Sequence, residues 1–411
     1  MKQLRTYLLL FTLLLLVRQG VSQQVGFDFP PDVHKTYIPF ERYNNLIVIP
    51  ITINHSLTLK FILDTGVQYP ILTEKVFGDY LGLNYTKNIT IQGPGAEDSI
   101  KAKIAQQVSL SLPGGVESGI NQALLVLEED YLELKNNLGT DVFGVIGYDI
   151  FSRFVVEINY DENYLVLHEP KKFRAKRSYR KIPMRVVNTK PYIEVTMMKN
   201  EEEGRKMHLM VDSGASHAVL LDNPEDESLI PEQNITSVIG RGLGGNINGY
   251  LGRMTSIKVG KFEFEEPIAT FPIEGDYGAA IKRGSRNGTI GGELLSRFNV
   301  VFDYFGSNLY LKKSSLYNKG FEHDMSGMNI VADGKNLDKL RVSSVRVNSP
   351  AFEAGLRVGD RIETINGYSL ESLKFSDFST LLRLKPGKKI VVKYVRDGES
   401  QKTSFKLVRY I

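Results

Sequence analysis

Residues Phe61–Gly66 (FILDTG) and Leu209–Gly214 (LMVDSG) decide the fold, because the same short pattern occurs twice in one chain of 411 residues. Each copy is an apolar run that ends in Asp, a hydroxyl residue and Gly. Apolar runs ahead of turn residues are typical of strands, so Asp64 and Asp212 are both expected where a strand ends. The two acids are 148 residues apart.

A second pair of matching stretches lies downstream at nearly the same offset. Val145–Tyr160 (VIGYDIFSRFVVEINY) and Thr289–Tyr304 (TIGGELLSRFNVVFDY) are identical at seven of sixteen positions without a gap. Two independent pairs at similar offsets indicate the duplication of a unit of roughly 130–150 residues.

Each unit is predicted to consist mainly of strands, because its apolar runs are short, rich in β-branched residues and bounded by turn residues. A doubly wound α/β fold is disfavoured, since long helices do not alternate with the strands. The expected strands are 45–53, 58–63 and 154–158 in the first unit and 192–197, 206–211 and 300–304 in the second, with short helices at 148–154 and 292–298.

The duplicated acids predict a specific chemistry if the two units pack about a pseudo-twofold axis. Asp64 and Asp212 then meet face to face, and two adjacent carboxylates share one proton. The ionised partner can act as a general base on water, and the protonated partner can donate to a carbonyl oxygen. The hydroxyls of Thr65 and Ser213 can hydrogen-bond across to the other unit, and Gly66 and Gly214 allow close backbone approach.

Residues 36–315 resemble the retropepsin-like aspartic peptidases in the form that joins two β-barrel lobes in one chain. The resemblance implies lobe 1 at 36–170, lobe 2 at 183–315, catalysis by Asp64 and Asp212, and cleavage of an extended peptide between the lobes. It also implies that Val145–Gly147 and Thr289–Gly291 pack under the catalytic loops. Thr65, Gly66, Ser213 and Gly214 are the expected supporting residues.

The chain departs from the pattern of that family at two places. Val67-Gln68 follows the first Asp-Thr-Gly where the family has Ala and a polar residue, which leaves the outer hydrogen bonds of this loop open. Thr289 is polar where an aliphatic residue is usual. His217, five residues after Asp212, is interpreted as an incidental polar neighbour, with a cleft-lining role as the alternative.

Glycine-bearing stretches at 91–95 and 240–245 lie where the resemblance implies flaps that close over substrate, with ordinary mobile hairpins as the alternative. The second stretch also matches G-x-G-x-x-G, but its polar, strand-like continuation argues against a dinucleotide site. Between the lobes, residues 169–182 carry seven Lys or Arg. This stretch is interpreted as a solvated linker, with an anion-binding patch or a processing site as the alternative.

The last ninety residues have a different pattern. Asn348–Ile362 (NSPAFEAGLRVGDRI), followed by Ile365-Asn366-Gly367, resembles the signature of PDZ domains, so residues 326–411 are predicted to form a partly open β-barrel with two helices. The expected helix is near 375–384, with strands at 389–395 and 404–410. The resemblance implies that backbone N–H groups of a loop at Gly327, Met328, Asn329 and Ile330 bind the C-terminus of a peptide.

The first residues predict an exported protein. Lys2 and Arg5 precede an apolar run at 7–17, and Gly20-Val21-Ser22 offers a cleavage site, so residues 1–22 are interpreted as a signal peptide, with an uncleaved anchor as the alternative. No membrane segment is expected after its removal. The chain has no Cys, which excludes disulfides and thiol chemistry. An exported chain without Cys favours the periplasm or surroundings of a bacterium.

These features together predict a secreted aspartic endopeptidase without cofactor or metal. The six His form no metal-binding spacing, no serine nucleophile motif occurs, and a net charge of +4 is too small for a nucleic-acid binder. The expected partners are a peptide or protein substrate in the cleft and a C-terminal peptide at the PDZ domain. The alternative is a weak or inactive scaffold that uses both sites for binding only.

Overall fold

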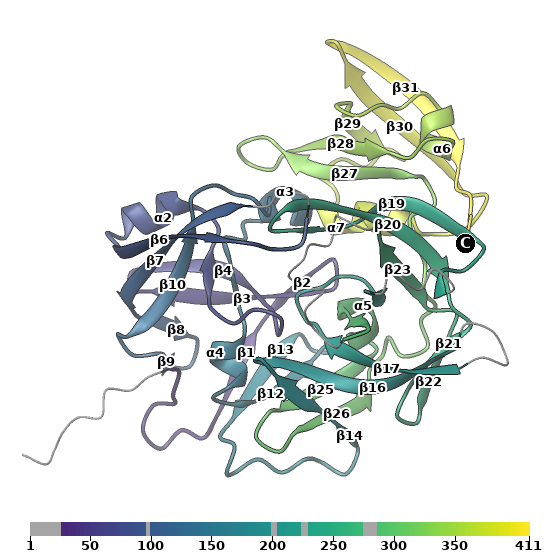
Figure 1. Cartoon of the computed structure of the whole chain (residues 1–411). Helices are drawn as coiled ribbons and strands as arrows, with labels where there is room; N and C mark the ends of the chain where they lie inside the picture. Colours follow the sequence, from purple (N-terminus) through teal and green to yellow (C-terminus); the bar gives the residue numbers. More distant parts are fainter. Residues whose placement is uncertain (1–25, 96–98, 199–203, 223–228, 274–285) are drawn as a thin grey trace, which may run out of the picture.

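The computed structural model describes residues 26–95, 99–198, 204–222, 229–273 and 286–411, so the predicted signal peptide at 1–22 lies outside the described residues. Figure 1 shows two β-rich lobes side by side, with a third domain above them. The chain is mainly β, as the sequence predicted. No helix within the described ranges is both long and apolar enough to cross a membrane.

Lobe 1 is built on a ten-stranded sheet in which β4 and β11 run parallel at the centre. Strand β2 (Glu41–Tyr43) pairs with β3 off the main path. The main path runs β6 (Asn84–Ile91), β7 (Ile100–Val108), β10 (Gln122–Leu127), β5 (Ile71–Leu72), β11 (Gly144–Ile146), β4 (Leu57–Leu63), β3 (Leu46–Ile53), β8 (Leu110–Leu112) and β9 (Val116–Glu117).

Lobe 2 repeats this order strand for strand, with β15 (Arg185–Val187) in the place of β2. The identical topology is what duplication of one unit predicts. The sequence identity between the lobes, by contrast, is confined to a few short stretches. The path runs β19 (Asn234–Gly242), β20 (Gly245–Arg253), β23 (Ile268–Pro272), β18 (Val219–Leu221), β24 (Gly288–Ile290), β17 (Gly204–Val211), β16 (Lys190–Met198), β21 (Ser256–Val259) and β22 (Phe262–Glu265).

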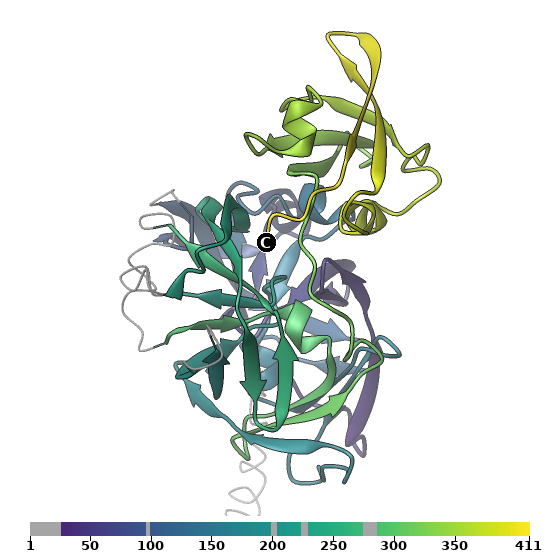
Figure 2. The same ribbon diagram turned by 90° about the vertical axis from the view of Figure 1, so that its right-hand side faces the viewer.

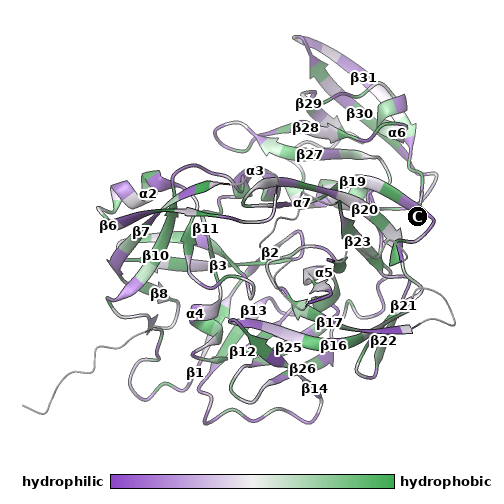
Figure 3. Cartoon of the chain, in the orientation of Figure 1, coloured by the Kyte–Doolittle hydropathy of each residue, from purple (hydrophilic) through white to green (hydrophobic). Residues whose placement is uncertain are grey.

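A six-stranded sheet joins the lobes beneath their shared face. Its central strands β12 (Val155–Asn159) and β25 (Phe298–Asp303) come from the two repeated stretches and pair antiparallel. Every residue of β25 is buried, including the polar Asn299 and Asp303, and Figure 3 shows both hydrophobic and hydrophilic colours in the region of this sheet. The outer strands are β1 (Lys35–Pro39), β13 (Tyr164–His168), β26 (Asn308–Lys313) and β14 (Arg180–Pro183).

Short helices follow the repeated Ile-Gly steps, as predicted. Helix α4 (Tyr148–Phe151) and helix α5 (Gly292–Leu295) begin at the expected residues and end three residues before the expected ends. The backbone then tightens into turns that lead directly into the central strands. Lobe 1 also contains α2 (Lys75–Tyr80) and α3 (Leu134–Leu138).

The C-terminal domain is a five-stranded antiparallel sheet with two short helices around its own hydrophobic core. The predicted helix is α7, and it ends three residues earlier than expected. The elements are β27 (Met328–Asp333), β28 (Lys339–Val345), α6 (Pro350–Glu353), β29 (Arg361–Ile365), α7 (Phe375–Leu381), β30 (Lys389–Arg396) and β31 (Glu399–Lys406).

The last strand differs from the prediction of 404–410. Asp397 and Gly398 both have positive φ and form a tight hairpin turn, so β31 pairs with β30 from Glu399 onward although its sequence is polar. The following residues leave the sheet instead of extending it. The side chain of Gln233 in lobe 2 donates to the Tyr410 carbonyl at 2.7 Å, and Figure 2 shows this end returning toward the lobes.

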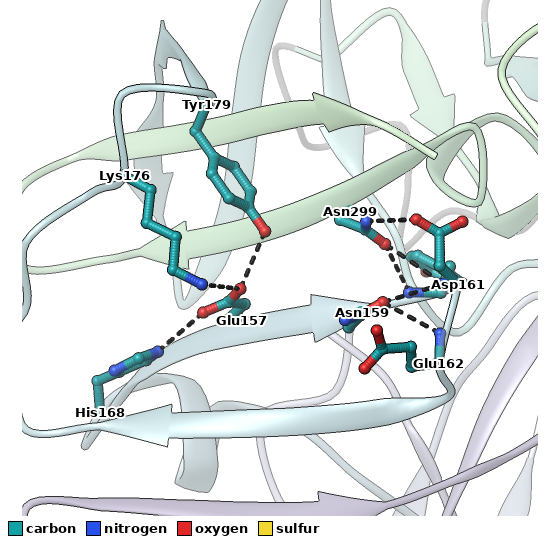
Figure 4. Close-up of polar contacts among 9 residues, drawn as sticks. Glu157, Asn159, Asp161, Glu162, His168, Lys176, Tyr179 and Asn299 are labelled. Atoms are coloured by element: carbon teal, nitrogen blue, oxygen red, sulfur yellow. Dashed lines mark hydrogen bonds and ion pairs between the residues drawn. The ribbon is translucent and has the colours of Figure 1, made fainter. Parts of the chain in front are cut away.

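The stretch between the lobes is exposed at all seven of its Lys and Arg residues, as its interpretation as a solvated linker predicts, and it is also tied to the central sheet. Figure 4 shows the contacts around Glu157 on β12. This buried carboxylate accepts hydrogen bonds from Tyr179 at 2.9 Å and His168 at 3.1 Å, and it pairs with Lys176 at 3.9 Å. The last three residues of the same stretch lie in the edge strand β14 (Arg180–Pro183).

Replacing Glu157 by Gln should lower the free energy of unfolding by about 1–3 kcal/mol at neutral pH, since a charged acceptor is lost. Burial alone would raise the pKa of Glu157, but the bonds from His168 and Tyr179 outweigh it and hold the pKa below its ordinary value of 4.5. A carboxyl whose pKa is lower in the folded chain than in the unfolded chain stabilises the fold at pH values above its unfolded pKa. This contribution is lost as the pH falls through the folded pKa.

Urea unfolding of both proteins at about pH 7 and about pH 3.5 therefore tests the role of this carboxylate, since the difference should shrink at the lower pH. The exposed Glu162, on the turn after β12, provides the control substitution Glu162→Gln. Equal losses of unfolding free energy in Glu157→Gln and Glu162→Gln would contradict the stabilising role of the Glu157 carboxylate.

Candidate active site

Each predicted catalytic Asp follows the central strand of its lobe. Asp64 comes directly after β4, and its N–H donates to Ile146 O on the parallel strand β11 at 2.8 Å. Asp212 follows β17, and its N–H donates to Ile290 O on β24, also at 2.8 Å. The two apolar segments therefore support the loops from below, and the backbone on both sides is fixed by sheet hydrogen bonds.

The hydroxyls of Thr65 and Ser213 link the two loops reciprocally. Thr65 Oγ1 donates to Val211 O at 2.6 Å, and Ser213 Oγ donates to Leu63 O at 2.8 Å. Ser213 Oγ also accepts the backbone N–H of Thr65 at 3.1 Å, and Thr65 Oγ1 accepts the backbone N–H of Ser213 at 3.0 Å. Both side chains are 1% exposed, so these four bonds satisfy polar groups that water does not reach.

The glycines after these hydroxyl residues let the carboxylates approach each other. A Cβ on Gly214 would lie 2.1 Å from Asp64 Cγ of the other lobe, and one on Gly66 would lie 3.0 Å from Oδ1 of Asp64 in its own loop. The N–H groups of Gly66 and Gly214 donate to Oδ1 of the Asp two residues earlier, at 2.6 Å and 2.9 Å. Each carboxylate is thus oriented by its own loop and faces the other.

The electrostatic surroundings of the two acids differ. Burial raises the pKa of both carboxyls, and the adjacent Asp212 raises that of Asp64 further, well above its ordinary value. The positive charge of Lys190 lowers the pKa of both carboxyls, and that of Arg286 further favours the ionised form of Asp212. These surroundings favour a pair that shares one proton, with the proton on Asp64.

The departure at Val67 leaves the first loop intact. Val67 O accepts the N–H of Tyr148 at 3.0 Å, and the equivalent Ala215 O in lobe 2 accepts the N–H of Gly292 at 2.6 Å. The outer backbone bond is therefore made in both lobes. It depends on the carbonyl and not on the identity of the side chain.

The second departure, Thr289, has a partner. Thr289 Oγ1 lies 2.8 Å from Nε2 of His217, so the unusual threonine and the nearby histidine form one hydrogen-bonded pair beneath the second loop. Burial lowers the pKa of His217 to about 4, and the imidazole is neutral at neutral pH. The sequence contained both residues, but 72 positions separate them.

Tyr304 was not identified from the sequence as a site residue. Its ring stacks on Phe151 with centroids 5.6 Å apart. Its buried hydroxyl has no hydrogen-bond partner among the residues described. Burial raises the pKa of Tyr304, and the neighbouring pair of Asp64 and Asp212 adds to this effect. The signal was its position at the end of the second repeat, aligned with Tyr160.

The two glycine-bearing stretches meet at their tips. Gly95 and Gly244 form a parallel bridge, and the Gly244 N–H donates to Pro94 O at 2.8 Å. Leu243 of lobe 2 packs on a hydrophobic cluster of lobe 1 that includes Ile100 and Leu138. A Cβ on Gly242 would lie 2.1 Å from Pro94 O, so this contact requires a residue without a side chain.

An internal carboxylate lies at the start of the expected peptide-binding loop of the C-terminal domain. Asp324 Oδ1 accepts the N–H groups of Ser326 and Gly327 at 3.0 Å and 2.7 Å, and Ser326 Oγ accepts the N–H of Met328 at 3.1 Å. Asn329 donates its side-chain amide to Ser344, at 2.9 Å, and Ile330 packs against the domain core. Of the four expected residues, Gly327 thus donates to a carboxylate and Met328 to a hydroxyl within the chain, and binding of a peptide by this loop stays a prediction.

Removing either loop hydroxyl should destabilise the fold. Thr65→Ala and Ser213→Ala should each lower the free energy of unfolding by about 1–3 kcal/mol, since each leaves a buried N–H and carbonyl unpaired. The double variant measures the coupling of the two loops: each hydroxyl makes two bonds of its own, so a loss smaller than the sum would show that the junction relaxes once one link is gone. Thr65→Ser and Ser213→Thr keep the hydroxyls and serve as controls in urea unfolding. Alanine and hydroxyl variants of equal stability would refute the reciprocal link.

Comparison with known families agrees with this architecture. The aspartyl protease family matches two segments, residues 49–150 and 195–293, each containing one Asp of the pair, and the PDZ domain family matches residues 320–407. No curated protein matches the chain at a significant level. The chain is therefore built from two lobes of the aspartyl protease family followed by a C-terminal PDZ domain.

Proposed function

We propose that the protein is an endopeptidase that hydrolyses a peptide bond held between the two lobes. The observation that carries this proposal is the meeting of Asp64 and Asp212 on loops locked by Thr65 and Ser213. A pair of carboxyls that shares one proton supplies a base and an acid in one place. Among the described residues no group of three or more metal-binding side chains is positioned to hold an ion.

In the proposed reaction the ionised Asp212 accepts a proton from water, whose oxygen attacks the scissile carbonyl carbon. Asp64 donates its proton to the carbonyl oxygen as the C–O bond forms, which neutralises the charge that develops there. The tetrahedral species then collapses, the C–N bond breaks, and a proton passes from the carboxyl pair to the leaving nitrogen. Arg286 favours this assignment of base and acid through its charge near Asp212.

Both catalytic residues should be essential. Asp64→Asn and Asp212→Asn should each lower kcat by about a thousandfold or more, and the double variant should be no worse, since the two act as one unit. Activity should rise as one carboxyl ionises and fall as the second loses its proton, which gives a bell-shaped pH profile. The measurement is cleavage of a quenched fluorescent peptide library, with thermal unfolding to confirm the fold.

Asp79→Asn, at an exposed carboxylate on α2, is the matched control and should retain full activity. Substantial hydrolysis by either dyad variant would exclude the proposed mechanism. Binding of peptides without any cleavage by the unaltered protein would favour the scaffold alternative.

We also propose that the protein is exported to a bacterial periplasm or beyond, and that the PDZ domain docks a peptide of the substrate or of a partner. The charged start, the apolar run and the small residues at 20–22 support export. PDZ domains bind peptides by adding a strand to a sheet edge. A peptide C-terminus would have to displace Asp324 from the loop N–H groups before it could bind there.

Mass spectrometry of the purified mature protein tests the export proposal. The expected N-terminus is Gln23, with the protein recovered in the soluble envelope fraction. Recovery of intact Met1 in the membrane fraction would support the anchor alternative and refute cleavage.

A further inference from the structure

The free edge of β27 is the strand edge to which a peptide would add. On the neighbouring strand β28, the N–H of Val342 donates to Asp360 O and its carbonyl accepts the N–H of Gly359, both at 2.9 Å. Both backbone groups of Val342 therefore point toward β29 and away from β27. Backbone groups alternate in direction along an antiparallel pair. Ile330, opposite Val342, and Ala332, two residues on, therefore direct their backbone groups away from β28, toward the free edge.

Lobe 1 covers this edge. The side-chain amide of Asn136 on α3 donates to Ala332 O at 2.8 Å, which is the position that a peptide strand would occupy. At the end of the same helix, Gly139 packs on Phe375, the first residue of α7, and a Cβ there would lie 2.3 Å from Phe375 Cβ. Figure 1 shows α3 beneath β27 and beside α7. The edge of β27 and the start of α7 are thus both in contact with lobe 1.

The same part of lobe 1 holds the hairpin of lobe 2. Residues 131–139, here called the bridge segment, end in α3. Arg241 on β19 donates through Nε to Tyr131 O at 3.1 Å and pairs through Nη2 with Glu133 at 2.9 Å. Leu243, at the tip, packs on the cluster to which Tyr131 and Leu134 belong.

The bridge segment is one hydrogen-bonded unit. The Glu133 N–H donates to Asp130 Oδ1 at 2.9 Å, and the Asn137 side chain donates to Glu133 O at 3.0 Å. Gly139, with a φ of 65°, closes the helix by donating to Lys135 O at 2.8 Å. About one helical turn separates the residues that hold Arg241 from those that contact the PDZ domain. Movement of one contact therefore displaces the other.

We propose that the bridge segment is a latch: it occupies the peptide edge of the PDZ domain and holds the β19–β20 hairpin closed, so that an extended peptide added to β27 displaces the latch and releases the hairpin. The two contacts are then thermodynamically linked, and each weakens when the other is broken. The consequence for catalysis, easier entry of substrate after a peptide binds, rests on the proposed endopeptidase function. The mechanical coupling itself does not.

Hydrogen exchange of the full chain carrying Asp64→Asn tests the coupling without any requirement for activity. Asn136→Ala removes the contact with Ala332, and exchange in residues 234–253 should accelerate about three- to tenfold, as expected for the loss of one or two partly exposed bonds. Asn336→Ala, at an exposed amide just after β27, is the matched control and should leave exchange unchanged. Unchanged exchange in Asn136→Ala would overturn the latch.

A double-variant cycle with Arg241→Ala separates a relay from independent effects. If the signal passes through the bridge segment, Asn136→Ala should add little to the exchange rate once Arg241 is gone, whereas additive effects would refute the relay. In the chain with Asp64 intact, Asn136→Ala should raise kcat/KM for short peptides several-fold. If exchange in the hairpin accelerates in Asn136→Ala but the chain with Asp64 intact cleaves no peptide, the latch stands and the proposed peptidase function is refuted.

Discussion

The reciprocal bonds between Thr65 and Ser213 constrain the whole molecule. Each hydroxyl must reach a carbonyl on the other lobe, 2.6 Å and 2.8 Å away, so the two loops must enter the junction from opposite directions at the same depth. This is possible only if both lobes place a parallel strand pair and its loop in the same way. The identical order of the two ten-stranded sheets meets this requirement, and the pairing of β12 with β25 fixes the lobes beneath it.

Symmetry of the backbone does not extend to the chemistry. Arg286, whose charge favours the ionised form of Asp212, and the His217–Thr289 pair both belong to lobe 2. Two carboxyls in equal surroundings would share the proton evenly. Unequal charge near one of them assigns the proton to the other. A single chain permits this difference, because the halves are free to change independently.

The PDZ domain is in contact with both lobes rather than tethered beside them. It contacts lobe 1 through Asn136 and lobe 2 through Gln233. The Gly327 N–H in its loop and the Ala332 carbonyl on its strand edge both bond to groups within the chain. Binding in trans must therefore compete with contacts in cis, and this competition is what gives the domain control over the hairpin that it overlies.

The sequence by itself determined the architecture and the pairing of Asp64 with Asp212, because these depend on short-range patterns that are present twice. The strand before Asp, the glycine after it and the repeated Ser-Arg-Phe stretch are each readable within a few residues. The PDZ signature was readable in the same way. Even the ends of the short helices were predicted to within three residues.

Only the tertiary structure decided which distant groups meet. Four polar contacts join residues that are distant in the sequence, and no local pattern encodes them. They are His217 with Thr289, Arg241 with Glu133, Asn136 with Ala332, and Glu157 with Tyr179. Asp324 is close in sequence to its loop, yet its role as an internal carboxylate depends on its burial there. Polar contacts of this kind are set by the packing of whole lobes, since a side chain finds its partner only after the strands and helices have been placed.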